Sequence, residues 1–111
     1  MSLRKKIGRN KYSNKITKVD GISFHSIRES KRYRDLKLLN DAGHISHLSL
    51  QPIFHIEING RKICKYIADF HYIDASGKEI FEDVKGMKTP VYRLKKKLVE
   101  AVHNVVITEI V

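Results

Sequence analysis

Two aspartates and a lysine, Asp69, Asp83 and Lys85, are the residues whose types and spacing could carry out chemistry. The segment between them, from Asp74 to Lys78, fits a type I turn closed by a left-handed glycine, as in a three-residue hairpin loop. This loop aligns the flanking strands so that Asp69 lies opposite Asp83, and the two-residue period of a strand places Lys85 on the same face. Opposed carboxylates repel by up to about 1 kcal/mol, and burial makes the repulsion worse. We therefore expect a cation between them.

Two other interpretations of these strands stay open. Lys85 could itself offset the charge of the two aspartates, which would make the group a cross-strand ion cluster without a metal. A four-residue hairpin loop would shift the register by one residue and place Glu82, in place of Asp83, opposite Asp69.

A third acidic residue, Glu29, lies in a segment that predicts a helix from Ile27 to Asn40 with Ser26 as its N-cap. On a helical wheel Glu29 lies within about 40° of Tyr33 and Leu36, which indicates an inward-facing position. The spacing of Ser26 and Glu29 also matches a capping box, which would explain the glutamate without any chemistry. The segment alone supports the two interpretations equally.

Turn and capping residues divide the rest of the chain into elements. Asp20-Gly21 and Asn59-Gly60 each predict a tight β-hairpin, and Thr89-Pro90 predicts a helix start, with a cap followed by proline. The predicted strands cover residues 47–58, with an edge or bulge at Pro52, then 62–73, 79–86 and 105–111, and the second helix covers 90–103. This order predicts a single α/β (α+β) domain in which a mixed central sheet is flanked by helices.

The second predicted helix carries both an apolar and a basic set of side chains. The apolar residues recur at helical spacing and should face the core: Val91, Leu94, Leu98 and Val102. The basic residues Arg93, Lys96 and Lys97 would then project away from the core towards solvent or DNA, and Lys95 belongs to the same basic run.

Positive charge is the strongest feature of the composition. The 111 residues include 22 Lys and Arg against 12 Asp and Glu, a net charge of +10, which favours nucleic acid as a partner. Residues 1–15 predict a flexible basic arm ahead of a domain over 16–111, and the arm's candidate DNA contacts are Lys5, Lys6, Arg9 and Lys11. A solubilising leader is the alternative interpretation of the arm.

Several classes of protein are excluded at this stage. The longest apolar runs have three or four residues, whereas a membrane-spanning helix needs about 20, so we expect a soluble protein without a membrane partner. The single cysteine, Cys64, can form neither an internal disulfide nor a zinc knuckle. No secretory signal pattern follows the basic start, which predicts an intracellular protein.

Taken together, five segments resemble the PD-(D/E)xK nuclease fold, and in detail a phage and prophage family of small endonuclease-like proteins that is similar to Holliday-junction resolvases. Two positions differ from the usual motif, since Ala68 stands in the place of its proline and Asp83 in a place more often held by Glu. Neither difference removes a ligand. The segments are Ser26-x-x-Glu29, Leu50-Gln51-Pro52, residues 66–70 (YIADF), 82–86 (EDVKG) and 92–97 (YRLKKK).

The resemblance implies a metal-dependent mechanism. Asp69 and Asp83 would bind Mg²⁺, or Mn²⁺ as a substitute, with help from the Val84 carbonyl, because hard cations take oxygen ligands. Glu29 would complete the site directly or through a water, and Lys85 would orient or deprotonate the attacking water or stabilise the developing charge. Gln51 would steady the water or the scissile phosphate, unless its amide bonds only to backbone.

The implied substrate is branched DNA in the cytoplasm of a bacterial host, cut by a phage- or prophage-encoded Holliday-junction resolvase acting in DNA recombination. Symmetric cleavage of two strands asks for two active sites and therefore a C2 homodimer. The chain has no room for a separate sequence-reading domain, so recognition should rest on phosphates and DNA shape. The alternatives are a phage nicking or recombination nuclease without junction preference, and a non-catalytic DNA-binding protein that keeps the nuclease fold.

Overall fold

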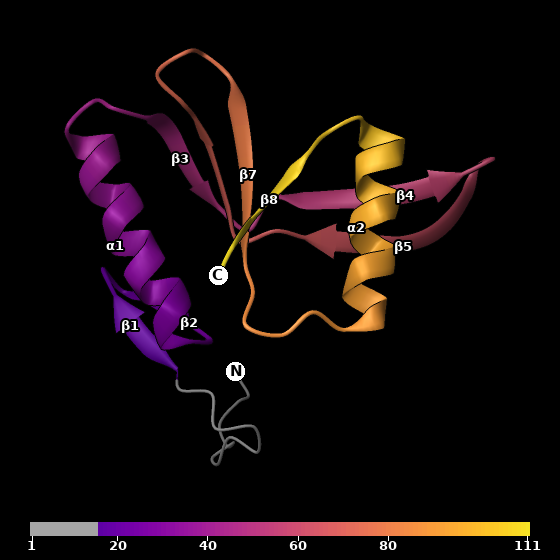
Figure 1. Cartoon of the computed structure of the whole chain (residues 1–111), viewed down its shortest axis with the longest axis horizontal. Coiled ribbons are helices and arrows are strands. Elements are labelled where there is room, and N and C mark those ends of the chain that lie inside the picture. The colour runs from indigo at the N-terminus through magenta and orange to yellow at the C-terminus, as the bar shows by residue number, and fades with distance from the viewer. Residues whose placement is uncertain (1–15) are drawn as a thin grey trace. The chain divides into compact units, whose positions relative to one another are not determined.

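The computed structural model describes residues 16–111, which fall into two compact units (Figure 1). The first unit ends at Asp35 and the second covers Leu36–Val111, so the boundary crosses the first helix. The two helices, the strand-to-helix order and a mixed sheet make this an α+β fold, in agreement with the coarse prediction.

The first unit begins with a hairpin of β1 (Thr17–Val19) and β2 (Ile22–Phe24), paired antiparallel. The connecting residues Asp20 and Gly21 have φ angles of 54° and 76°, as the Asp-Gly pair predicts. Tyr33 of the following helix contacts this hairpin twice. Its ring centre lies 5.2 Å from that of Phe24, and its hydroxyl donates a hydrogen bond of 2.9 Å to Asp20. These contacts hold the hairpin against the start of the helix.

That helix, α1 (Ile27–Asp41), begins where the sequence predicts. The Oγ of Ser26 accepts a hydrogen bond of 3.0 Å from the backbone N–H of Glu29, which satisfies one of the donors left over at a helix start. The helix extends one residue beyond the predicted end at Asn40.

The main sheet of the second unit has four strands in the order β3-β6-β7-β8. Neighbouring strands are antiparallel except for β7 and β8, which run parallel, so the sheet is mixed. The strands are β3 (Ser46–Leu50), β6 (Phe70–Ile73), β7 (Glu79–Val84) and β8 (Ile107–Ile110).

The loop between β6 and β7 confirms the predicted turn and register. Gly77 has a φ of 88°, and the N–H of Asp74 donates a hydrogen bond of 2.9 Å to the carbonyl of Lys78. The Asp74 carboxylate accepts bonds from Ser76 and from the Lys78 N–H, which lower its pKa. Pairing then runs without a bulge from Ile73 with Glu79 to Phe70 with Glu82.

A two-stranded ribbon, β4 (Ile53–Ile58) and β5 (Arg61–Ile67), projects from this sheet. The irregularity predicted at Pro52 is a break between two strands, at Gln51-Pro52. The prediction of one strand over 62–73 is wrong, since it breaks at Ala68-Asp69. The reason is local: Gln51 has a φ of 52°, and Pro52 has no N–H for a ladder.

The break is nevertheless a bend within one hairpin. Leu50 pairs with Phe70 before it and Ile53 with Ile67 after it, which is the same register. Across the bend, the Gln51 N–H donates to the Asp69 carbonyl at 3.0 Å, and the Ala68 N–H donates to the Pro52 carbonyl at 3.1 Å. The bend thus places Asp69 where the sheet ends and the ribbon begins.

The second helix, α2 (Pro90–His103), starts at the predicted cap, with Thr89 accepting a hydrogen bond of 3.1 Å from the Tyr92 N–H. It packs on the β4–β5 ribbon, as Figure 1 shows. Of the predicted apolar stripe only Leu98 packs against the core, whereas the other three residues, Val91, Leu94 and Val102, are exposed. Tyr92 and Val99 are buried in their place. The helix is rotated so that the large ring of Tyr92 faces the sheet. The core it completes consists of Ile56, Tyr66, Ala68, Tyr92, Val99 and Ile107.

Within residues 16–111, neither helix has the length and apolar content that a membrane span requires.

Candidate active site

Asp69 is fixed at the bend of the hairpin by both its backbone and its side chain. Its N–H donates to the Glu82 carbonyl at 2.9 Å, and its carbonyl accepts from Gln51. Its Oδ2 accepts a hydrogen bond of 2.7 Å from the backbone N–H of Val84. At the end of β7 the Val84 N–H is thus bonded to the Asp69 carboxylate and not to a backbone carbonyl of a neighbouring strand. These bonds leave Asp69 little freedom to move.

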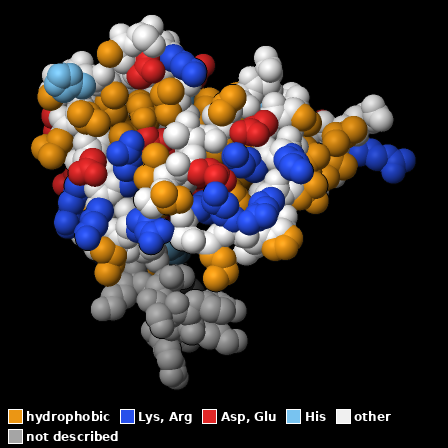
Figure 2. Space-filling model, in the orientation of Figure 1, with side chains coloured by type: hydrophobic (Ala, Val, Ile, Leu, Met, Phe, Trp, Pro, Cys, Tyr) orange, Lys and Arg blue, Asp and Glu red, His pale blue; other side chains and the backbone are white. Residues whose placement is uncertain are grey.

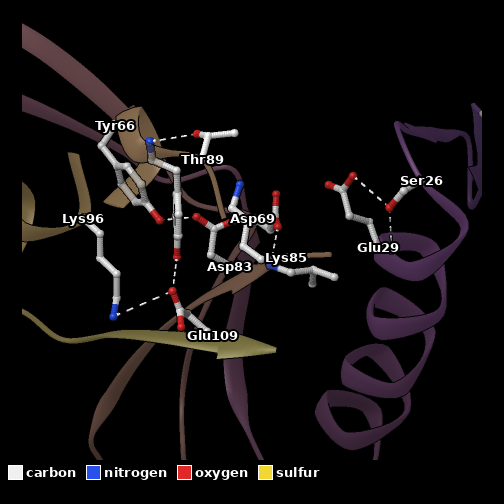
Figure 3. A network of polar contacts seen from close by, with 11 residues as sticks. Ser26, Glu29, Tyr66, Asp69, Asp83, Lys85, Thr89, Lys96 and Glu109 are labelled. Atoms are coloured by element: carbon white, nitrogen blue, oxygen red, sulfur yellow. Dashed lines mark hydrogen bonds and ion pairs between the residues drawn. The ribbon is translucent and has the colours of Figure 1, made fainter. Parts of the chain in front are cut away.

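Asp83 faces Asp69 from β7, one step beyond the last ladder pair, and its side chain is buried. The Tyr66 hydroxyl donates a hydrogen bond to Oδ2, and the Nζ of Lys85 lies 3.4 Å from Oδ1 (Figure 3). Burial raises the pKa of Asp83 to about 6, and the neighbouring Asp69 carboxylate adds to the rise against the opposing effects of Tyr66 and Lys85. The predicted pair of opposed carboxylates thus exists, and its surroundings disfavour the ionised form of Asp83.

Lys85 follows the last residue of β7 and shares a face with Asp83. Its backbone N–H donates a hydrogen bond of 2.9 Å to the Ile110 carbonyl. Its Nζ lies 4.6 Å from the ring centre of Tyr92, a cation–π contact, and its side chain is 29% exposed. The structure therefore brings Asp69, Asp83 and Lys85 together, with the lysine on the more open side.

A further carboxylate, Glu109, lies beside Asp83 because β8 runs parallel to β7 with these two residues in register. Its Oε2 accepts a hydrogen bond of 2.7 Å from the Tyr92 hydroxyl, and its Oε1 lies 2.9 Å from the Nζ of Lys88. The bonds from Lys88 and Tyr92 lower the pKa of Glu109. Figure 3 shows this carboxylate linked to α2 through Lys96 as well, at 3.8 Å.

Glu82 points to the opposite face of β7, which answers the question of register left by the sequence. It is buried like Asp83, and its Oε2 accepts a hydrogen bond of 2.5 Å from the Tyr72 hydroxyl. The three-residue loop, rather than the four-residue one, therefore places Asp83 opposite Asp69.

Glu29 belongs to the first unit, whereas Asp69, Asp83 and Lys85 belong to the second. Within its own unit it forms the capping arrangement that the sequence allows. The Ser26 hydroxyl lies 3.3 Å from Oε1 of Glu29 and donates to it, while the Glu29 N–H donates to Ser26 (Figure 3). The capping interpretation is thus realised, although through the serine hydroxyl and not through its backbone N–H.

The basic residues of α2 do not all project outward as predicted. Arg93 and Lys97 are exposed, whereas Lys95 and Lys96 are partly buried. Lys96 lies 3.8 Å from both Glu100 and Glu109, because the rotation of α2 turns it towards β8. Figure 2 shows Lys and Arg side chains on the drawn face next to Asp and Glu. The expectation of an outward-facing Lys96 is therefore wrong.

The other candidate DNA contacts have separate outcomes. Gln51 is exposed and lies at the bend opposite Asp69, with its backbone N–H bonded to the Asp69 carbonyl. Lys5, Lys6, Arg9 and Lys11, together with the rest of the predicted arm, lie outside the described residues.

Tyr66, Tyr92 and Glu109 take part in the site, although the sequence did not single them out. In a straight strand Tyr66 and Asp69 would point to opposite faces, and only the bend at Ala68 brings the Tyr66 hydroxyl to Asp83. Glu109 could be placed beside Asp83 only once the parallel pairing between β7 and β8 was known. The available signal for Tyr92 was its aromatic ring near the start of a helix.

The donor set fits a hard divalent cation. Mg²⁺ is usually held by one or two carboxylates, with waters and substrate phosphates as its other ligands, and Asp69 and Asp83 supply two adjacent carboxylates. A cation there would also offset the cost of keeping the buried Asp83 charged. In the described part of the chain, no group of three or more His, Cys, Asp or Glu side chains forms a ready-made metal cage.

Comparison with known proteins gave one match, which covers nearly the whole chain. A family model with the description "Protein of unknown function (DUF1064)" matches residues 9–111. The comparisons with curated proteins and with solved structures gave no match.

Proposed function

We propose that the chain, which belongs to the DUF1064 family, is a metal-dependent endonuclease that hydrolyses phosphodiester bonds in branched DNA. The observation that carries the proposal is the facing pair Asp69 and Asp83, with Lys85 held 3.4 Å from the second of them. Two carboxylates and a lysine on adjacent strands are suited to binding a cation next to a phosphate and to placing a positive group beside it.

Asp69 and Asp83 would hold the cation. When bound, Mg²⁺ would lower the pKa of a bound water and neutralise charge on the phosphate oxygens. The Asp69 side chain is already oriented by the Val84 N–H at 2.7 Å, and the Asp83 side chain by Tyr66 and Lys85. Ligands fixed in advance have less entropy to lose on binding.

Lys85 would orient the attacking water or stabilise the charge that develops at phosphorus. Its position over the Tyr92 ring keeps the ammonium group near Asp83, and its side chain retains access to solvent. A lysine that served only to neutralise the two aspartates would not need this access.

The sequence resemblance to PD-(D/E)xK nucleases supports the same proposal. Of its two acids and lysine, Asp83 lies on β7, Lys85 directly follows β7, and Asp69 lies at the bend that precedes β6. In that family pattern Glu29 would add a ligand, directly or through a water, and in the first unit its carboxylate accepts a hydrogen bond from Ser26. The more specific assignment of the α+β fold, as restriction-endonuclease-like, is part of this proposal.

DNA would be bound through its phosphates by Arg93 and Lys97 on α2, by Gln51 near the bend, and by the basic arm. Cleavage of both strands of a junction would require two copies of the chain related by a twofold axis. The setting that suits these features is recombination of phage or prophage DNA in the bacterial cytoplasm.

The decisive experiment compares Mg²⁺-dependent cleavage of a four-way junction with that of a linear duplex built from the same arms. We expect cleavage of the junction by the wild type and by Glu82→Gln, and none by Asp83→Asn. Cleavage of both substrates at the same rate would favour a nuclease without junction preference. If none of the three proteins cleaves either substrate with Mg²⁺ or Mn²⁺, the proposal is wrong.

One observation favours a second candidate, a DNA-binding protein that does not cut. Both oxygens of Asp83 already have partners in the protein, Tyr66 and Lys85, as expected for a cross-strand ion cluster. Junction binding that is equal with and without Mg²⁺, and without any product, would support this candidate.

A further inference from the structure

Tyr66 is a buried residue that takes part in no chemical step of the proposed mechanism. It lies on β5, 4% exposed, and its hydroxyl donates a hydrogen bond to the Oδ2 of Asp83, which is 1% exposed. A buried tyrosine hydroxyl normally finds one partner, and here that partner is a proposed metal ligand.

The ring of Tyr66 has little room to move away from Asp83. Its centre lies 6.4 Å from that of Tyr92 and 6.3 Å from that of Phe54, so aromatic neighbours contact it from two elements. It also belongs to the main core, with Ile56 and Val99. The hydroxyl is therefore held in one place by packing, and the carboxylate must adjust to it.

The two oxygens of Asp83 consequently have different surroundings. Oδ2 is bonded to the buried Tyr66, whereas Oδ1 faces Lys85, whose side chain is 29% exposed. A quarter turn of the carboxylate about its Cβ–Cγ bond would break the bond from Tyr66, whereas a half turn would only exchange two equivalent oxygens. The Tyr66 bond thus keeps one oxygen of Asp83 directed towards Lys85, the more exposed of its two partners, from whose side a cation and a phosphate could approach.

We propose that Tyr66 is a positioning residue that sets the affinity of Asp83 for a divalent cation. This inference rests on the proposed function for the identity of the ligand. Partners that orient a metal ligand in this way typically change metal affinity or activity by about 10- to 100-fold when removed.

The protein contains its own matched control. Tyr72 donates to Glu82 at 2.5 Å on the opposite face of β7, and both residues of this pair are buried. Tyr66→Phe and Tyr72→Phe each delete one hydroxyl from a tyrosine–carboxylate bond and keep the ring. A general loss of packing should therefore appear in both variants, and a loss of cation affinity in only one.

The experiment is a calorimetric titration of the whole protein with Mg²⁺, with melting temperatures recorded alongside. We expect about 10- to 100-fold weaker binding for Tyr66→Phe and a change within about twofold for Tyr72→Phe. Cleavage by Tyr66→Phe should be restored at high Mg²⁺, because the catalytic groups themselves are intact. Equal affinity losses in the two variants would overturn the role of Tyr66.

A spectroscopic measurement on the wild type covers the case in which Tyr66→Phe does not fold. The chain has no tryptophan, so its near-ultraviolet absorbance reports on its tyrosines. Mg²⁺ should produce a tyrosine difference spectrum in the wild type and in Tyr72→Phe, because the ion changes the charge that Tyr66 faces. Cation binding without this spectrum would also overturn the inference.

Failure of the inference and failure of the proposed function give different results. If Asp83→Asn loses Mg²⁺ binding while Tyr66→Phe keeps it in full, only the role of Tyr66 is wrong. If the wild type itself binds no Mg²⁺, both the inference and the proposed metal site are wrong.

Discussion

The two faces of β7 carry the same kind of contact with different surroundings. On one face the buried Asp83 accepts a hydrogen bond from Tyr66, and on the other the buried Glu82 accepts one from Tyr72. Asp83 also has a second carboxylate, Asp69, close enough to raise its pKa, and it is paired with Lys85, whose side chain is 29% exposed. The difference lies in the neighbours, because the strand, the burial and the phenolic donor are shared.

This comparison separates what burial requires from what a site requires. A buried carboxylate needs hydrogen bonds, and a tyrosine can provide one on either face. Two carboxylates facing each other gain nothing from burial, and they lower stability unless a cation joins them. The face of Asp83 therefore has the charge arrangement that the proposed metal site needs. The face of Glu82, which has a buried carboxylate and a tyrosine donor as well, serves as the control.

The largest expected effect concerns Lys85. Lys85→Ala should reduce Mg²⁺-dependent cleavage by about 100- to 10,000-fold, because a group that acts on the water or the developing charge is removed. DNA affinity should fall by no more than a few fold, and the exposed loop variant Lys78→Ala should change neither. Single-turnover cleavage and binding assays would check this. Parallel losses of binding and cleavage would instead make Lys85 a phosphate contact.

The next effect is on stability without metal. At pH 8 and with a chelator present, Asp83→Asn should raise the free energy of unfolding by up to about 3 kcal/mol. The reason is that a pKa of about 6, against 3.8 normally, corresponds to roughly 1.4 kcal/mol per unit. Glu82→Gln should lower it by about 1 kcal/mol, since the bond from Tyr72 becomes a neutral one. Urea unfolding would measure the free energy of unfolding of both variants. A change in the same direction for Asp83→Asn and Glu82→Gln would contradict the contrast between the two faces.

The same contrast should depend on pH. A raised pKa means that the unfolded chain loses the Asp83 proton near pH 4, whereas the folded chain keeps it until about pH 6. The folded state then binds more protons in this interval, so its stability falls as the pH rises. The gain in free energy of unfolding of Asp83→Asn over the wild type should therefore be near zero below pH 4 and complete above pH 6. An advantage that stays constant from pH 4 to 8 in urea unfolding would refute this assignment.

The smallest effect concerns two neighbouring lysines on α2. Lys97 is exposed, whereas Lys96 lies 3.8 Å from the carboxylates of Glu100 and Glu109. Lys97→Ala should flatten the slope of log affinity for DNA against log salt by about 0.9. Lys96→Ala should flatten it less, because its charge is already offset within the protein. Binding measured at several salt concentrations would show this, and equal changes would place both lysines on the phosphates.

Local signals were enough to predict much of the fold. Asp20-Gly21 and Asn59-Gly60 form the tight turns expected of them, and Thr89 caps α2 through the Tyr92 N–H. The glycine-closed loop after Asp74 fixed the register of β6 and β7, and with it the meeting of Asp69 and Asp83. Each of these depends on residues only a few positions apart, which is why the sequence reveals them.

The features that were missed depend on contacts between distant segments. Pro52 indicated an irregular strand, but its effect as a bend became evident only with the pairing of Gln51 and Asp69. The rotation of α2 depends on the packing of Tyr92 against Tyr66, 26 positions earlier in the chain. Glu109 joins the site through a parallel pair, which no turn residue specifies.

The bent hairpin has a consequence for how related chains can change in length. Its register is the same on both sides of the bend, and its two irregularities lie away from the bend, one between Ser46 and Ser49 and one beyond Ile56, near the Asn59-Gly60 tip. Residues inserted in pairs at that tip would lengthen the ribbon and leave Asp69 in place. A single inserted residue would need another bulge, or it would turn Tyr66 and Phe54 out of the core. Related chains that keep Asp69 in place can therefore differ in the length of this ribbon by an even number of residues.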